Sequence, residues 1–124
     1  MRLAQLNQKL AVARLAAASA LPEGLFGGAD FVSVTQTDDE LSIVASSEKL
    51  KDFDTKEDGW IAFKVLGPLD FSLVGILANL SDALAKAGIS LFAVSTFDTD
   101  YILVKEGDAA AAGAAFQSAG HELI

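Results

Sequence analysis

The second half of the chain shows the clearest change between apolar and polar positions. One helix face is predicted by leucines at helical spacing, namely Leu73, Leu77, Leu80 and Leu84. Asp70 and Ser72 are the candidate caps for its first turn, because either side chain can accept hydrogen bonds from the unpaired backbone amides there. Lys86 falls in the last turn and Gly88 follows it, as expected at a helix C-terminus.

Two runs of branched and aromatic residues follow this helix, Ile89 to Thr96 and Asp100 to Lys105. The short polar segment Phe97 to Thr99 separates them, so they predict a β-hairpin. The alanine-rich residues 108–119 predict a second, modest helix. From Trp60 onward the expected order is strand, helix, strand, strand, helix, strand, which is the ferredoxin-like βαββαβ arrangement.

Residues 67–105 resemble the ACT domain family, small regulatory modules that sense amino acids. Gly75, the pair Ala87-Gly88 and the strand Ile89–Val94 match the general pattern of a glycine at the helix start, a small residue and glycine at its end, and an Ile-rich strand. The segments GPLDFSLVGIL and STFDTDYILV are similar to those of small bacterial ACT proteins, of the eukaryotic cytosolic arginine sensors and, more distantly, of aspartokinase regulatory regions. The resemblance covers about residues 59–124.

The first half can be aligned with the second as an internal repeat. Without gaps, Phe31–Val44 aligns with Leu91–Val104 at three identical positions, and Leu10–Leu15 matches Ile61–Leu66 in its apolar positions. We infer two copies, the first with a shortened helix around residues 21–28. The predicted fold is α+β, with tandem ferredoxin-like ACT modules, antiparallel sheets and an abbreviated first module.

The charged stretch Ser46–Gly59 is predicted to be an exposed connection between the two copies. We therefore expect residues 1–58 to form the abbreviated N-terminal module with its connection, and residues 59–124 to form the C-terminal ACT domain. Because either half alone is marginal in size, the two halves are expected to share one core. ACT-like sheets often pair edge to edge, so a homodimer is predicted.

Composition removes several classes of function. A net charge of −8 and a pI near 4.4 leave no basic surface for nucleic acid. Zero cysteines and the single His121 exclude disulfides, thiolate metal sites and multi-histidine sites, and no cofactor is expected. No segment reaches about 18 apolar residues, and polar residues interrupt the N-terminal stretch, so we expect a cytoplasmic protein with no membrane partner. The sequence shows no paired nucleophile and base or phosphate loop, which favours a non-enzymatic role.

The candidate ligand site lies at the start of the long helix. Free backbone amides there attract a carboxylate, and Asp70 offers a negative charge for an α-ammonium group. The alternative is that Asp70 and Ser72 only cap the helix; Asp98 and Asp100 are likewise open to a turn role or a ligand role. Gly75, expected one turn into the helix, permits close approach of a strand or ligand. The predicted site comprises Leu69, Asp70, Phe71, Ser72, Leu73, Val74, Gly75, Ile76, Ser95, Thr96, Asp98 and Asp100.

These features together predict a regulatory protein of the ACT type. We expect it to bind a small molecule, an amino acid before other ligands, and to change its own association or the activity of a target protein. The alternative is a protein-interaction or structural ACT module without a ligand response.

Overall fold

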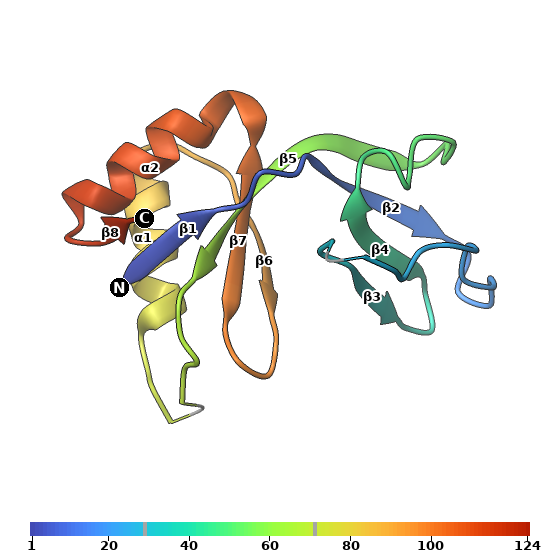
Figure 1. Ribbon diagram of the computed structural model, residues 1–124, viewed down its shortest axis with the longest axis horizontal. Helices are drawn as coiled ribbons and strands as arrows, with labels where there is room; N and C mark the ends of the chain where they lie inside the picture. The colour runs from blue at the N-terminus through green and yellow to red at the C-terminus, as the bar shows by residue number, and fades with distance from the viewer. Residues whose placement is uncertain (29, 71) are drawn as a thin grey trace. The chain divides into compact units, whose positions relative to one another are not determined.

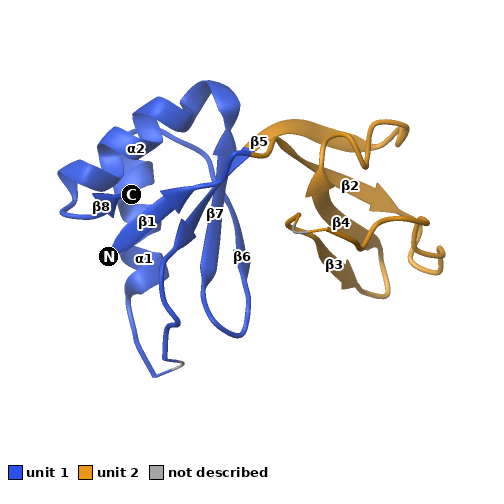
Figure 2. Cartoon of the chain, in the orientation of Figure 1, with its two compact units in different colours: residues 1–7, 61–124 blue, residues 8–60 orange. Residues whose placement is uncertain are grey.

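The computed structural model describes every residue except Ala29 and Phe71. The chain forms two compact units, which Figure 2 distinguishes by colour. Unit 1 contains residues 1–7 and 61–124, and unit 2 contains residues 8–60. The predicted division falls between residues 58 and 59, and the two units meet between residues 60 and 61. The first seven residues differ, because they belong to unit 1 and not to the N-terminal module.

Unit 1 has the element order that the sequence predicts. Along the chain it contains β1 (Arg2–Gln5), the end of β5 (Lys56–Val65), α1 (Ile76–Lys86), β6 (Phe92–Ser95), β7 (Asp100–Lys105), the 3-10 turn η1 (Glu106–Asp108), α2 (Ala109–Ser118) and β8 (Glu122–Leu123) (Figure 1). From β5 onward this is strand, helix, strand, strand, helix, strand. The ferredoxin-like prediction for this part of the chain is confirmed.

Strand β1 is an addition that the sequence analysis did not predict. It lies between β5 and β8, so the strand order in unit 1 is β8-β1-β5-β7-β6. Leu3 pairs antiparallel with Val65 of β5 and parallel with Leu123 of β8. Leu3 is the only fully buried residue of this four-residue strand, and so short a segment gives too little alternation to be recognised.

The core of unit 1 lies between its sheet and both helices (Figure 1). The strands contribute Leu3, Phe63, Val65, Ile102 and Val104, and the helices contribute Leu80, Ala83, Leu84, Ala112 and Phe116. The rings of Phe63 and Phe116 meet edge to face, with centroids 5.3 Å apart and planes at 74°. Burying one side chain of this size stabilises the fold by about 1.5–3 kcal/mol.

Unit 2 is a small antiparallel sheet without a helix among its described residues. Its strands are β2 (Leu10–Leu15), β3 (Ser33–Gln36), β4 (Leu41–Ser46) and the beginning of β5. The shortened helix predicted around residues 21–28 is wrong. Three of those eight residues are glycine and one is proline, and both types are costly inside a helix.

Each unit has its own core cluster. The cluster of unit 2 contains Ala11, Ala13, Leu25, Ile43, Ala45 and Leu50, and none of these belongs to the cluster of unit 1. The prediction of one shared core is therefore wrong. The small side chains of Ala11, Ala13 and Ala45 leave room on the sheet for Leu25, which is 3% exposed and comes from an irregular segment.

The charged stretch before β5 is not only a connection. Leu50 is fully buried within it, and β5 already begins at Lys56. The predicted exposed connection Ser46–Gly59 is therefore partly core and partly strand. Only Leu50 and the partly buried Phe53 pack on the core from this stretch. The charged side chains around them make its sequence similar to that of a solvated linker.

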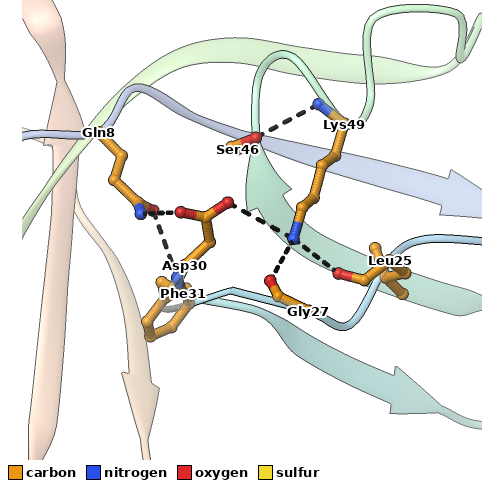
Figure 3. A network of polar contacts seen from close by, with 7 residues as sticks. All are labelled: Gln8, Leu25, Gly27, Asp30, Phe31, Ser46 and Lys49. Atoms are coloured by element: carbon orange, nitrogen blue, oxygen red, sulfur yellow. Dashed lines mark hydrogen bonds and ion pairs between the residues drawn. The ribbon is translucent and has the colours of Figure 1, made fainter.

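A polar network holds the irregular segment of unit 2 in place (Figure 3). The Nζ atom of Lys49 donates to the carbonyl oxygens of Leu25 at 2.9 Å and Gly27 at 3.3 Å, and it lies 3.5 Å from Asp30 Oδ2. Gln8 donates to Asp30 Oδ1 at 2.8 Å and accepts from the backbone N–H of Phe31 at 3.3 Å. These bonds satisfy backbone groups that a helix would otherwise have paired.

The two hairpins of the proposed repeat have a different register from the predicted alignment. Gln36 pairs with Leu41 at the closed end of the first hairpin, and Ser95 pairs with Asp100 in the second. Equivalent positions are therefore 59 residues apart (95 − 36), whereas the ungapped alignment places them 60 apart (91 − 31). A shift of one residue exchanges the two faces of a strand. The three identities of that alignment do not occupy equivalent positions.

We predict that residues 59–124 alone will not fold cooperatively. Without β1, Leu3 leaves the core and β8 loses its partner strand. A chain of residues 61–124 followed by a short glycine-serine linker and residues 1–7 should fold in one urea transition, since the Glu122 N–H already bonds the Met1 carbonyl at 2.9 Å. Equal stability of the two chains in urea would show that β1 is dispensable.

We also predict that Lys49→Met destabilises the protein by about 1–3 kcal/mol, because it leaves the carbonyl groups of Leu25 and Gly27 without this donor and removes the ion pair with Asp30. The matched control is Lys51→Met, which removes only an exposed ion pair with Glu48 and should not change stability measurably. Urea unfolding of both variants checks this. Equal midpoints for the two variants would contradict a structural role for Lys49.

Candidate functional site

Helix α1 begins later than the sequence predicts. Gly75 is its N-cap, with a φ of 80°, a left-handed conformation that glycine adopts without a steric penalty. The predicted start at Asp70 or Ser72 is therefore wrong, and Gly75 precedes the helix instead of lying one turn inside it. Leu73 also lies outside the helix and is 53% exposed. The C-terminal prediction is confirmed, because α1 ends at Lys86.

Asp70 folds the loop before α1. Its Oδ1 accepts the backbone N–H of Ser72 at 2.8 Å, and its carbonyl accepts the N–H of Leu73 at 3.0 Å. This is a turn of the kind that aspartate forms with its own backbone. The hydrogen bonds from Ser72, with the backbone bond the stronger influence, hold the pKa of Asp70 below its usual value. Asp70 therefore caps a loop turn and not the helix, and its carboxylate is charged at neutral pH.

The end of the β6–β7 hairpin forms the opposite wall of the site. Thr96 and Thr99 bond each other across the turn, with Thr96 N–H to the Thr99 carbonyl at 2.8 Å and Thr99 N–H to Thr96 Oγ1 at 3.3 Å. Ser95 Oγ donates to Asp100 Oδ1 at 2.6 Å. The backbone N–H of Leu69 donates to the Asp98 carbonyl at 2.7 Å and joins the two walls.

A pocket of about 280 Å³ lies between the loop before α1 and the hairpin end. It lies wholly within unit 1. Its lining comes from the loop and the helix start (Leu69, Asp70, Leu73, Gly75, Ile76, Leu77 and Ala78) and from the hairpin end (Ser95, Thr96, Phe97, Asp98, Thr99 and Asp100). This volume is close to the lower limit for small-molecule pockets and suits a ligand of amino-acid size better than a nucleotide.

Most of the predicted site residues line this one pocket. Nine do so: Leu69, Asp70, Leu73, Gly75, Ile76, Ser95, Thr96, Asp98 and Asp100. Ser72 and Val74 are not in the lining, and Val74 is 91% exposed. Phe71 lies outside the described residues.

Sequence reasoning missed four lining residues: Leu77, Ala78, Phe97 and Thr99. Leu77 and Ala78 lie in the first turn of a helix that begins at Ile76. They would have been included if Gly75 had been recognised as the cap. Phe97 and Thr99 belong to the segment that was assigned to the turn. Both residues lie between two strand ends that were predicted to line the site, and this position could have identified them.

The polar groups of the pocket are complementary to separated positive and negative charges. Asp70, Asp98 and Asp100 are acidic, and no basic residue is among the described lining residues. The first turn of α1 adds backbone N–H groups at Ile76, Leu77 and Ala78, because the first bond of the helix runs from Asn79 N–H to the Gly75 carbonyl. No side chain of the described residues caps these amides. The lining therefore offers groups that can bind an anion and groups that can bind a cation.

Other candidate chemistry lies away from this pocket. His121 Nε2 is 2.6 Å from Asn79 Oδ1, and its ring packs edge to face on Phe116. Within residues 1–28, 30–70 and 72–124, no three histidine, aspartate or glutamate side chains are placed to hold a metal ion. None of the helices in those ranges has the length and apolar character needed to cross a membrane.

Comparison with family models divides the chain much as its structure does. A model described as an ACT domain matches residues 55–118, which is more than half of the chain. A second model, described as an N-terminal domain, matches residues 8–52. No curated protein matches the sequence.

Solved structures agree with this assignment. A protein from Agobacterium tumefaciens is 40% identical with a TM-score of 0.90, over 99% of this chain and 91% of that one. The ligand-free regulatory subunit of aspartate kinase from Thermus thermophilus has a TM-score of 0.63 at 12% identity, over 94% and 95% of the chains. Aspartate kinase from Clostridium acetobutylicum has a TM-score of 0.68 at 14% identity, over 94% of this chain and 34% of the enzyme. The two kinase chains share the fold, and together with the family model they confirm the resemblance seen in the sequence. The chain belongs to the ACT domain family, a family of regulatory domains.

Proposed function

We propose that this protein is a regulatory sensor that binds a free α-amino acid in the pocket before α1. The observation that carries the proposal is that helix amides without a side-chain cap and three carboxylates belong to residues that line one small pocket. A free α-amino acid has a carboxylate and an ammonium group on neighbouring atoms, and few other metabolites of this size present both charges.

The ligand carboxylate binds the N-terminus of α1 in this proposal. The N–H groups of Ile76, Leu77 and Ala78 point along the helix axis and carry the positive end of the helix dipole. The eleven-residue helix is long enough for this effect. Gly75 supports this role, because a glycine at the cap leaves no side chain in front of these amides.

The ligand ammonium binds an aspartate in this proposal. Asp70 Oδ1 is already used by Ser72 N–H, which fixes the direction of the carboxylate and leaves Oδ2 for a ligand. Asp98 is the second candidate, because its carbonyl is tied to Leu69 while its side chain lies on the turn that lines the pocket. The carboxylate of Asp100 accepts from Ser95 Oγ.

We propose a role without catalysis, in which the ligand changes the protein's own association or the activity of a target protein. Acid-base or covalent chemistry needs a nucleophile within reach of a base, and the pocket lining offers hydroxyls and carboxylates but no histidine, lysine or cysteine among its described residues. The homodimer, the target protein and the cytoplasmic location remain predictions.

The alternative function, a protein-interaction module without ligand response, is supported by one feature of the same region. Leu73, Val74 and Phe97 are 53%, 91% and 80% exposed, and they lie on the two segments that frame the pocket. Large apolar side chains that are exposed together often mark a contact surface. An interaction module would use this rim without a ligand beneath it.

We predict that at least one of the twenty common amino acids raises the melting temperature. At 100 times its dissociation constant a ligand stabilises the native state by about 2.7 kcal/mol, which corresponds to roughly 5–10 °C for a chain of this size. N-acetylated and decarboxylated analogues of that amino acid should bind much more weakly, because each lacks one charge. If no amino acid at millimolar concentration shifts the melting temperature, the interaction-module function is favoured.

We predict that Asp70→Asn abolishes the ligand-induced shift and leaves the unliganded melting temperature nearly unchanged. Asparagine keeps the oxygen that accepts Ser72 N–H but removes the charge. Asp98→Asn should weaken binding less. Asp39→Asn, at the position of the β3–β4 turn that is equivalent to Asp98, is the control and should bind normally. A lower unliganded stability with unchanged affinity in Asp70→Asn would show that Asp70 is only a loop cap.

A further inference from the structure

Thr99 is unusual because it is a buried polar residue in a hairpin turn. It is 6% exposed and is the polar residue that the described part of the chain buries most completely. Its Oγ1 donates to the carbonyl oxygen of Val65, the last residue of β5, at 2.5 Å. Val65 itself is fully buried. A buried hydroxyl aimed at a buried carbonyl satisfies both groups, and losing one of them is costly to the other.

The hairpin turn does not need this bond to form. The first hairpin closes in the same way, with Thr37 N–H donating to the Glu40 carbonyl at 2.9 Å, as Thr96 N–H does to Thr99 at 2.8 Å. Thr37 and Thr96 therefore occupy equivalent positions, and Glu40 stands where the second hairpin has Thr99. Since the first turn forms with a glutamate there, the hydroxyl of Thr99 serves something beyond the turn.

The neighbour of Thr99 joins the two walls of the pocket. Asp98 accepts the Leu69 N–H at 2.7 Å, so the loop before α1 is attached to the hairpin one residue away from the Thr99–Val65 bond. Leu69 follows β5 after a short turn that contains Pro68. The hydrogen bond from the Thr99 hydroxyl thus attaches the turn to the end of β5. This attachment places the Asp98 carbonyl where it accepts the Leu69 N–H.

We propose that Thr99 is a positioning residue that fixes the hairpin end against β5 and so preforms the pocket. Its effect on ligand affinity rests on the proposed amino-acid function, but its effect on the unliganded protein does not. Without the Thr99–Val65 bond, the Leu69–Asp98 bond opens more often, while the Thr96–Thr99 turn stays closed. In a protein without this bond, ligand binding must also order the two walls of the pocket. The free-energy cost of this ordering lowers the affinity.

The test is hydrogen exchange of the intact, unliganded chain, read at individual backbone amides by NMR. Thr99→Val replaces the hydroxyl by a methyl group of similar size, and we expect exchange at the Leu69 amide to become about tenfold faster, as for the loss of one hydrogen bond. Exchange at the Thr96 amide should change little. Thr99→Ser keeps a hydroxyl and should restore protection at Leu69. Thr37→Val, in the first hairpin, is the control and should leave Leu69 unchanged.

Several outcomes overturn the proposal. Unchanged exchange at Leu69 in a folded Thr99→Val protein would show that the bond does not hold the loop. Equal acceleration at all amides would show a general loss of stability. A failure of Thr99→Ser to restore protection at the Leu69 amide would show that the hydroxyl does not hold the loop. If Thr99→Val does not fold, the comparison of Thr99→Ser with Thr99→Ala tests the proposal instead. Only the alanine variant should show faster exchange at the Leu69 amide. All these measurements are made without ligand, so their outcome is independent of whether an amino acid binds.

Discussion

The site depends on the place where α1 begins, and Gly75 determines that place. A left-handed residue cannot continue a right-handed helix toward the N-terminus, so the first free amides are those of Ile76 to Ala78. A helix that began after Asp70 or Ser72 would carry its free amides about 5–8 Å further along the axis. The pocket would then lack its anion-binding end. The loop before Gly75 remains irregular for the same reason. Asp70 folds it into a turn directly after Leu69, and the Leu69 N–H bonds the hairpin.

The sequence predicted unit 1 well where its periodicity was long. Three of the four leucines at helical spacing lie in α1, with Leu73 outside it, and the hairpin and the second helix appear in the expected order. The helix start was missed because Asp70 and Ser72 are common cap residues, and nothing local distinguishes a cap of a loop turn from a cap of a helix. Nine of the twelve predicted site residues nevertheless line one pocket. They belong to the loop before α1 and to the end of the β6–β7 hairpin, and an error in the helix start does not move them out of these two segments.

The remaining misses come from tertiary interactions that leave little trace in a sequence. Strand β1 has one fully buried residue, and its place between β5 and β8 is determined by partners that are distant in the chain. In place of the helix predicted in unit 2 there is an irregular segment, which is fixed by the Lys49 hydrogen bond and by the burial of Leu25. One lysine within a charged stretch of sequence does not indicate such a role. The internal alignment counted identities that a one-residue difference in register separates.

We propose that an amino acid binds between the start of α1 and the hairpin end. The most direct measurement is a titration of the isotope-labelled protein with the amino acid that stabilises it most, followed through backbone amide chemical shifts. We expect saturable changes concentrated at Ile76 to Ala78 and at Ser95 to Asp100, with little change in residues 8–60. Saturable changes centred elsewhere in the chain, with these amides unaffected, would contradict the proposal.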